Sequence, residues 1–292
     1  MKQSTRQRAQ GGFSLLEVMV SLVIGLVVVG AVLVSYMASG KAGKQQVAYA
    51  EMNENAQIAL GILSRDLLLA GYSNPTGINA SAAVPPVKTF SKNFAGRPVF
   101  GCDQGFVTPN TLGAVACGTT GTPSLEVAYE ADLTNTVPTS SAPTEPSDCL
   151  GNRLSATGAF YVTYNRYYLS SGSTGRSELH CASAAKDSSG GTIPGQPLVD
   201  NVEAMRIWYG EAASAAARSA VVRYVTAGNV TDWNLIVSVR ICLLMRSSEP
   251  VLQSDEDTLT YLDCASVQQT SNDRYARRAY FTTTTLRNRM AF

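Results

Sequence analysis

The chain has 292 residues, a length that allows one globular domain with additional elements or two small domains. Hydrophobic residues make up 45% and charged residues only 15%, which excludes an intrinsically disordered chain. The formal net charge is +1, and Lys2, Arg6 and Arg8 supply three positive charges before residue 13. The rest of the chain therefore carries a net charge of −2, and this charge gives no reason to expect nucleic-acid binding.

A long apolar block begins at Phe13. Residues 1–12 read MKQSTRQRAQGG and hold no acid, whereas residues 13–37 contain one charge, Glu17. As a helix this block is long enough to span a bilayer, and the basic residues before it predict a cytoplasmic N-terminus. A secretory signal is cleaved at small residues after its apolar core, but here a Gly-Gly pair precedes the core. Cleavage before the core would keep the helix in the mature protein.

Glu17 is unusual inside a membrane segment. An isolated carboxylate there costs roughly 2.5 kcal/mol or more at the bilayer centre, so it needs a partner or a function. Cleavage after Gly12 would create an amino group on Phe13, four residues before Glu17. Such an ammonium on a neighbouring subunit could neutralise the carboxylate. The alternative is an interfacial glutamate in a plain signal anchor.

The stretch GGFSLLEVMVSLVIG resembles the class III signal of type IV prepilins and of type II secretion pseudopilins. In that family a short basic leader ends in Gly, the first mature residue is aromatic or Met, and the fifth is Glu. Gly12, Phe13 and Glu17 occupy these places. The resemblance implies cleavage between Gly12 and Phe13 by a prepilin peptidase, N-methylation of Phe13, and an assembly contact at Glu17.

The helical pattern continues beyond the apolar block. No strong helix breaker occurs before Gly71 and Pro75, although Gly40 and Gly43 can loosen the helix locally. One helix from Phe13 to Leu69 is therefore predicted, with its second half packed on a globular domain; an amphipathic helix in a separate fold is the alternative. The apolar stripe of this second half consists of Met52, Ala56, Ala59, Leu63, Leu67 and Ala70.

All six cysteines follow the apolar block, which suits an oxidising compartment such as the periplasm. No spacing is C-x-x-C, so a zinc ribbon or a thioredoxin-like site is disfavoured. Nearest-neighbour pairing is expected because each pair brackets a short loop-rich stretch, and six unpaired thiols are the alternative. The expected pairs are Cys102 with Cys117, Cys149 with Cys181, and Cys242 with Cys264.

The rest of the chain predicts strands. Residues 73–157 are rich in Gly, Pro, Ser, Thr and Asn, which favours short strands and long disulfide-held loops over flexible low-complexity sequence. Residues 158–169 alternate, with Phe160, Val162 and Tyr164 on one face. Further strands are predicted within residues 201–210, where Val202, Met205, Ile207 and Tyr209 are apolar, and within residues 220–225 and 277–290.

Residues 234–247 form the strongest predicted strand. Its opposite face, which carries Ser238, Arg240, Cys242 and Arg246, should be partly solvated and able to hold a disulfide from Cys242. One face is apolar throughout and consists of Leu235, Val237, Val239, Ile241, Leu243 and Met245.

One long helix followed by many strands predicts an α+β fold, with the helix laid against an antiparallel sheet. Pilin heads share this architecture. The expected organisation is a cleaved leader (1–12), an N-terminal helix (13–70) whose first half is transmembrane or in a filament core, and a periplasmic, disulfide-stapled β-rich head (71–292). Residues 201–210, 234–247 and 277–290 resemble PilW-type minor pilins, and J-type minor pseudopilins of type II secretion share the same plan.

No catalytic or metal site is expected, and no cofactor. His180 is the single histidine and no G-x-S-x-G elbow is present, so a surface histidine is favoured over a Ser-His-Asp triad. The acidic run at residues 254–257 lacks the spaced ligands and Gly of an EF-hand, which favours a solvated turn. No P-loop or dinucleotide fingerprint occurs. The chain is therefore expected not to be an enzyme.

The resemblance implies a minor pilin that initiates type IV pilus assembly at or near the tip. A J-type pseudopilin of type II secretion is the second hypothesis, and a signal-anchored periplasmic enzyme is the third. Expected partners are other minor pilins, the major pilin, a tip adhesin and the prepilin peptidase, but no nucleic acid. The expected location is the bacterial inner membrane, with the head in the periplasm, and then the pilus fibre at the cell surface.

Overall fold

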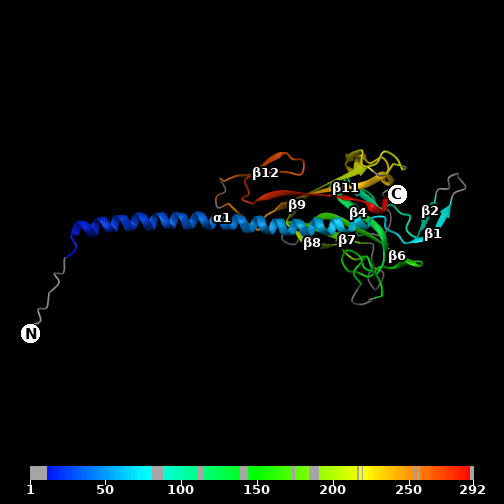
Figure 1. Cartoon of the computed structure of the whole chain (residues 1–292), viewed down its shortest axis with the longest axis horizontal. Helices are drawn as coiled ribbons and strands as arrows, with labels where there is room; N and C mark the ends of the chain where they lie inside the picture. Colours follow the sequence, from blue (N-terminus) through cyan, green and yellow to red (C-terminus); the bar gives the residue numbers. More distant parts are fainter. Residues whose placement is uncertain are drawn as a thin grey trace, which may run out of the picture. The chain divides into compact units, whose positions relative to one another are not determined.

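The computed structural model describes residues 12–80, 88–110, 115–138, 144–172, 175–183, 191–215, 217–218, 220–252, 254 and 257–289. The chain divides into two compact units, Met1–Val47 and Ala48–Phe292, and we call the second unit the head. This division falls inside the long helix α1, so the C-terminal part of α1 folds together with the strands (Figure 1).

Helix α1 spans Leu15–Leu69, so it begins two residues after the predicted start and ends at the predicted residue. Its segment Leu15–Met37 is 23 residues long and apolar enough to cross a membrane. Gly71 follows the helix with a φ of +73°, a left-handed conformation that glycine adopts without strain. The Gly71 N–H donates to the carbonyl of Ala128, which ties the helix end to a strand.

The predicted apolar stripe of α1 is confirmed within the head. Every residue of the stripe from Met52 to Ala70 is at most 1% exposed. These small and medium side chains recur at helical spacing, so one face of the helix is completely covered by strands while the other stays in solvent. The burial of this face fixes the C-terminal half of α1 into the head.

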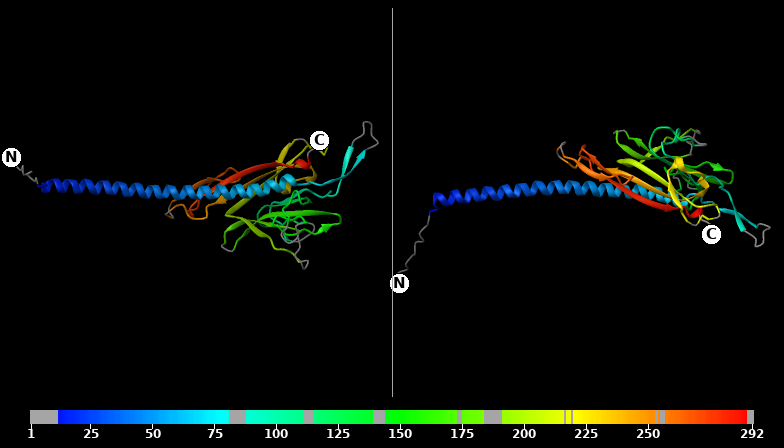
Figure 2. Two further views of the ribbon diagram at one scale, coloured as in Figure 1. Left: turned by 60° about the horizontal axis from the view of Figure 1, so that its bottom comes forward. Right: turned by 90° about the horizontal axis from the view of Figure 1, so that it is seen from above.

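Two larger antiparallel sheets pack against this half of α1 (Figure 2). In the first sheet the order is β3 (Val99–Cys102), β4 (Ser124–Ala131), β6 (Phe160–Ser171), β7 (Ser177–Ala182) and β8 (Gln196–Asp200), with β5 (Ala156–Thr157) beside β6. In the second sheet the order is β10 (Arg223–Val225), β9 (Val202–Glu211), β11 (Ile236–Arg246) and β14 (Arg277–Thr285). Two hairpins complete the described strands: β1 (Pro75–Ala80) with β2 (Lys88–Lys92), and β12 (Leu259–Leu262) with β13 (Gln268–Ser271).

One hydrophobic core joins the helix to both sheets. Leu63 of α1, Tyr167 and Leu179 of the first sheet, and Ile207 and Ile241 of the second all belong to it and are at most 3% exposed. Burying apolar surface of this kind contributes about 25 cal/mol per Å² and is the main force that holds the layers together. The predicted α+β fold, a helix laid on antiparallel sheet, is confirmed.

Strand β11 has the predicted apolar face, since Val239, Ile241, Leu243 and Met245 are fully buried. Its other face is more covered than predicted. Of the four residues assigned to it, Arg240 is exposed and Arg246 is half-buried, whereas Ser238 is 2% and Cys242 0% exposed. Cys242 is covered because its disulfide holds the loop after β12 over this face. Ser238 lies beside the hydroxyl of Tyr224 at 3.2 Å, and its own hydroxyl donates to the carbonyl of Thr284.

Strand β6 buries an unexpected face. Phe160, Val162 and Tyr164 do lie on one face, but they are only half-buried. The opposite face, with Thr163, Asn165 and Tyr167, is fully buried against α1 and β4. Strand β4, which pairs with β6, is buried along its whole length and was not singled out as a strand by its sequence.

Three disulfides join Cys102 to Cys117, Cys149 to Cys181, and Cys242 to Cys264. These are the pairs that nearest-neighbour pairing gives. Each bond fastens a strand of a larger sheet to a neighbouring loop: β3 in the first case, β7 in the second and β11 in the third.

Removing the Cys102–Cys117 bond with the double substitution Cys102→Ala and Cys117→Ala should lower the free energy of unfolding of the head by about 3 kcal/mol, the entropy of closing a loop of this size. Denaturant titration of the oxidised parent and the double variant measures the difference. Reduction of the parent provides the control, because it should destabilise the parent further than the single missing bond does. Equal unfolding midpoints for parent and variant would contradict the prediction.

Candidate functional site

The N-terminal segment carries the residues that the sequence singles out for processing and assembly. Gly12 and Phe13 lie before α1, outside any helix or strand, and the Phe13 side chain is 82% exposed. Glu17 lies in the first turn of α1 and is exposed. The rest of the predicted leader, residues 1–11, lies outside the described residues. An exposed peptide bond outside a helix is more accessible to a peptidase than one inside a helix.

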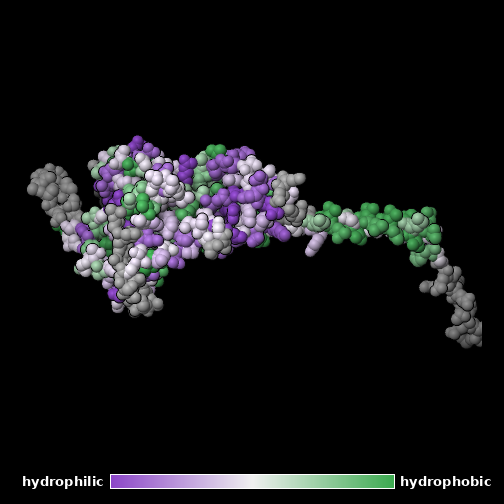
Figure 3. Space-filling model, turned by 180° about the vertical axis from the view of Figure 1, so that it is seen from behind, coloured by the Kyte–Doolittle hydropathy of each residue, from purple (hydrophilic) through white to green (hydrophobic). Residues whose placement is uncertain are grey.

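The surface of Leu15–Met37 is apolar on all sides. None of this segment is buried within the chain, and Figure 3 shows it as an almost continuous hydrophobic band. Glu17 is its single charge. A helix that is hydrophobic all round requires either lipid or other helices as its surroundings. The segment is therefore consistent with membrane anchoring and with packing among similar helices.

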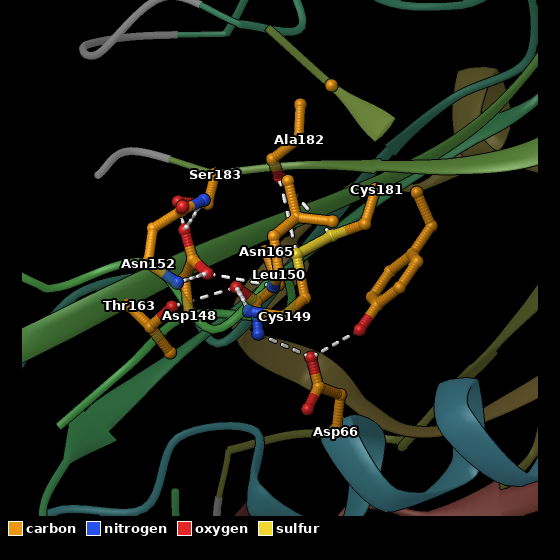
Figure 4. Close-up of a disulfide and its surroundings, with 12 residues drawn as sticks. Asp66, Asp148, Cys149, Leu150, Asn152, Thr163, Asn165, Cys181, Ala182 and Ser183 are labelled. Atoms are coloured by element: carbon orange, nitrogen blue, oxygen red, sulfur yellow. Dashed lines mark hydrogen bonds between the residues drawn. A yellow bond between two sulfur atoms is a disulfide. The ribbon is translucent and has the colours of Figure 1, made fainter. Parts of the chain in front are cut away.

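A second feature is a buried carboxylate where α1 meets the first sheet. Asp66 of α1 accepts hydrogen bonds from the hydroxyl of Tyr167 (2.6 Å), the side-chain amide of Asn165 (2.6 Å) and the hydroxyl of Tyr129 (3.2 Å). Figure 4 shows the Asp66 side chain projecting from the helix toward Asn165. Three donors from β4 and β6 thus converge on one acceptor from the helix.

The environment of Asp66 sets its ionisation. Burial raises the pKa of this carboxyl, while the bonds from Tyr167, Asn165 and Tyr129 and the charge of Arg65 act in the opposite direction. Burial and the nearby Asp66 carboxyl also raise the pKa of Tyr167 well above its ordinary value, so its hydroxyl keeps its proton and donates. The arrangement is a polar clamp between helix and sheet.

The clamp continues from Asn165 to the second disulfide. The Asn165 side-chain oxygen accepts from the Cys149 N–H at 3.1 Å and from the Thr163 hydroxyl at 2.9 Å (Figure 4). Asp148, next to this cysteine, is itself held by the N–H groups of Leu150 and Asn152 and by Ser183. A cavity of about 350 Å³ lies beside the clamp and is lined in part by Asp66 and Asp148.

Asp66 was not identified as a site residue from the sequence. Its position contains a signal nonetheless, because it lies three residues after Leu63 and four before Ala70, on the apolar stripe itself. An acidic side chain on a buried helix face needs donors from the neighbouring layer. The polar inward face of β6 supplies two of them, and Tyr129 of β4 supplies the third.

The other residues singled out by the sequence do not form a reaction centre. His180 is half-buried, with its Nε2 3.2 Å from a carboxylate oxygen of Glu178 and its ring beside Tyr168. Ser254 and Asp257 are exposed, and the two acids between them lie outside the described residues. Among the residues that the structure describes, no group of three or more potential metal ligands comes together.

Comparisons with known proteins identify the N-terminal segment. Residues 7–33 match the family model described as the prokaryotic N-terminal methylation motif. That match covers Gly12, Phe13 and Glu17. Together with the apolar helix and the antiparallel head, this match supports a type IV pilin-like protein.

Residues 166–288 match the family model described as type IV pilus-assembly protein W. The two matches together support a type IV pilus minor pilin of the PilW type. A solved type IV-like pilin from Thermus thermophilus resembles this chain with a TM-score of 0.36 and 12% sequence identity. The match covers 82% of this chain and 98% of that pilin, and at this distance nothing further is concluded from it. No curated protein matches the sequence.

Proposed function

We propose that this chain is a minor pilin that enters a type IV pilus through its apolar helix and primes assembly at or near the tip together with other minor pilins. The observation that carries the proposal is the N-terminal segment: a helix that is apolar on all sides and has one carboxylate, preceded by Gly12 and Phe13 outside any helix or strand. The role is structural, and no catalytic step is assigned to the chain.

The physical sequence of events follows from that segment. Before assembly the helix lies in the inner membrane as a single pass, with the leader in the cytoplasm and the head in the periplasm. Cleavage between Gly12 and Phe13 leaves an N-terminal ammonium, which a prepilin peptidase also methylates. When the helix leaves lipid for a bundle of similar helices, this ammonium of one subunit can neutralise Glu17 of the next. Major and minor pilins supply those helices, and a tip adhesin is a further proposed partner.

Mass spectrometry of the protein from piliated cells tests the processing step. We expect a mature chain that begins at methylated Phe13. The variant Gly12→Val should accumulate with its leader attached, because a side chain at the last leader position obstructs the peptidase, whereas Gly11→Ala should be processed like the parent. A mature N-terminus at Met1 or beyond residue 37 would refute the proposal.

A minor pseudopilin of type II secretion is the second candidate, since it would use the same helix and the same cleavage. The match of residues 166–288 to the pilus-assembly family favours the pilus. Deletion of the gene separates the two. Loss of surface pili and of twitching motility with intact secretion supports the pilus, and loss of secretion with intact pili supports the pseudopilin.

A further inference from the structure

The solvent face of the second sheet carries an unusual group of side chains. Trp208 of β9 lies directly opposite Arg240 of β11, and Arg206 of β9 lies opposite Cys242 of β11, which faces Phe281 of β14 on its other side. Side chains opposite one another on neighbouring strands project from the same face. We call Arg206, Trp208, Arg240 and Phe281 the arginine–aromatic face.

The two guanidinium groups are held over aromatic rings. The Cζ atom of Arg206 lies 5.3 Å from the ring centre of Trp208. The Cζ atom of Arg240 lies 5.9 Å from the same ring and 5.6 Å from that of Phe281. Both arginines are exposed and Phe281 is 44% exposed. Contact with the rings limits the freedom of these side chains, and their exposure leaves the guanidinium groups accessible to a partner.

Neither arginine of this face forms an ion pair with any residue in the described part of the chain. Asp263, directly after β12, interacts with the face, because, besides the hydrogen bond from the Val267 N–H, the charge of Arg206 helps to lower the pKa of its carboxyl. Its oxygens already accept from the N–H groups of Ala265 and Val267 and from the Gln269 side chain. By contrast, Arg277 of the same sheet is bonded to both Glu203 and Asp273. The arginine–aromatic face thus carries positive charge that Asp263 offsets only in part and that no direct ion pair in the described part of the chain neutralises.

The face is also concave. A cavity of about 410 Å³ lies between it and the loop that the Cys242–Cys264 bond holds, with Ala265 and Ser266 on that wall and Tyr224 on the other side. A second hollow of about 740 Å³ shares Phe281 and Ser266 and extends along the hairpin to Leu262. Hollows of a few hundred Å³ accommodate side chains of a partner, whereas a flat sheet face does not.

We propose that the arginine–aromatic face binds an acidic segment of another protein, one that presents carboxylates beside an apolar side chain. The planar guanidinium group of arginine matches a carboxylate in geometry and in charge. The apolar side chain of the partner would occupy the hollow beside Trp208 and Phe281. Tryptophan, tyrosine and arginine are the residues that dominate binding energy in protein interfaces. A nucleic acid fits less well, because the chain as a whole is nearly neutral and the face holds two cations only.

This binding goes beyond the proposed filament role, because the face lies on strands of the head and uses neither Glu17 nor Phe13. A variant that loses the binding should therefore still be cleaved and still carry its membrane helix. Conversely, a failure of processing at Gly12 would leave the binding of a soluble peptide to the head unchanged. The two proposals can fail separately.

Isothermal titration calorimetry on the full chain in detergent micelles tests the proposal. The probe is a short synthetic peptide in which aspartates flank a phenylalanine, and its matched control replaces each aspartate by asparagine. We expect saturable binding of the acidic peptide and about tenfold weaker binding of the neutral one, the loss expected when charge-assisted hydrogen bonds are removed. Binding should also weaken as salt is raised.

Protein variants locate the contact. Arg206→Gln and Arg240→Gln should each weaken binding of the acidic peptide about tenfold but leave binding of the neutral peptide nearly unchanged, a coupling that a folding defect would not produce. Arg287→Gln, at an exposed arginine away from this face, is the matched control and should bind like the parent. Equal binding of the two peptides, unchanged affinity in both arginine variants, or binding of an oligonucleotide or of anionic vesicles in place of the acidic peptide would overturn the proposal.

Discussion

Replacing Asp66 by alanine should lower the free energy of unfolding of the head by about 4 kcal/mol, because Tyr167, Asn165 and Tyr129 then lose a buried acceptor together. Part of the loss is offset, since alanine also removes the penalty of burying a carboxyl group. Denaturant titration followed by circular dichroism measures the difference. Glu54→Ala, at an exposed acidic position on the same helix, is the control and should stay within about 0.5 kcal/mol of the parent.

The pH dependence of stability gives Asp66 a distinct signature. Burial raises its pKa in the folded chain above the ordinary value of 3.8, so the folded chain keeps a proton that the unfolded chain releases. The favourable contribution of the protonated Asp66 carboxyl to folding stability is complete below pH 3.8, and it is lost as the pH rises through the raised pKa of the folded state. Asp66→Asn keeps the shape without the titration. The stability of the parent relative to Asp66→Asn should therefore fall as pH rises from about 4 toward neutrality.

Two outcomes would contradict this account of Asp66. One is an alanine variant as stable as the parent, which would mean that the three donors find other partners at no cost. The other is a difference between the parent and Asp66→Asn that rises with pH, which would mean that the folded chain favours the ionised carboxylate.

Glu17→Ala should remove the protein from pili while leaving its membrane insertion and leader cleavage intact. Insertion should become easier without the charge, since a carboxylate in an apolar segment is unfavourable. Assembly should suffer because the N-terminal ammonium of a neighbouring subunit loses its partner in a low-dielectric helix bundle. We expect the amount of this protein in sheared pili to fall about tenfold or more, which corresponds to a loss of only about 1.4 kcal/mol. Immunoblots of pilus and membrane fractions measure it.

The matched control for Glu17 is Ser21→Ala, one turn further along the helix, where the hydroxyl donates to the Val18 carbonyl of its own helix. That variant should assemble like the parent. Normal incorporation of Glu17→Ala together with normal co-purification with other minor pilins would show that the carboxylate is not an assembly contact. Loss of the Glu17→Ala protein from the membrane fraction would instead contradict the expected intact insertion.

Periodicity was the most informative part of the sequence for the fold. The spacing of the stripe from Met52 to Ala70 reflects burial on one side of a helix. The alternation within residues 234–247 predicted strand β11 and its apolar face, but not the burial of Ser238 and Cys242 on the other face. Strand β4 could not be predicted in this way. It is buried on both faces and therefore carries no alternation, and two of its buried residues, Glu126 and Glu130, are acidic.

The polar interior was the part that the sequence could not supply. Glu126 is tolerated because Arg166 of β6 lies 2.7 Å away in the same buried layer, and Asp66 because β4 and β6 supply its donors. Each partner is far away along the chain, so no local sequence pattern indicates which residues pair with Glu126 and Asp66. The N-terminal segment differs in this respect, since Gly12, Phe13 and Glu17 are recognisable from their order alone. The arginine–aromatic face likewise depends on register across three strands.

The order of the cysteines along the chain has a consequence for export. Each disulfide joins consecutive cysteines, and no bond encloses or crosses another in the sequence. In a chain that enters an oxidising compartment from its N-terminal side, Cys102 meets Cys117 before Cys149 has arrived, and every later cysteine likewise finds only its own partner free. Correct bonds can therefore form during translocation in the order of emergence, with no reshuffling by an isomerase. We expect the head to leave the translocation machinery already cross-linked.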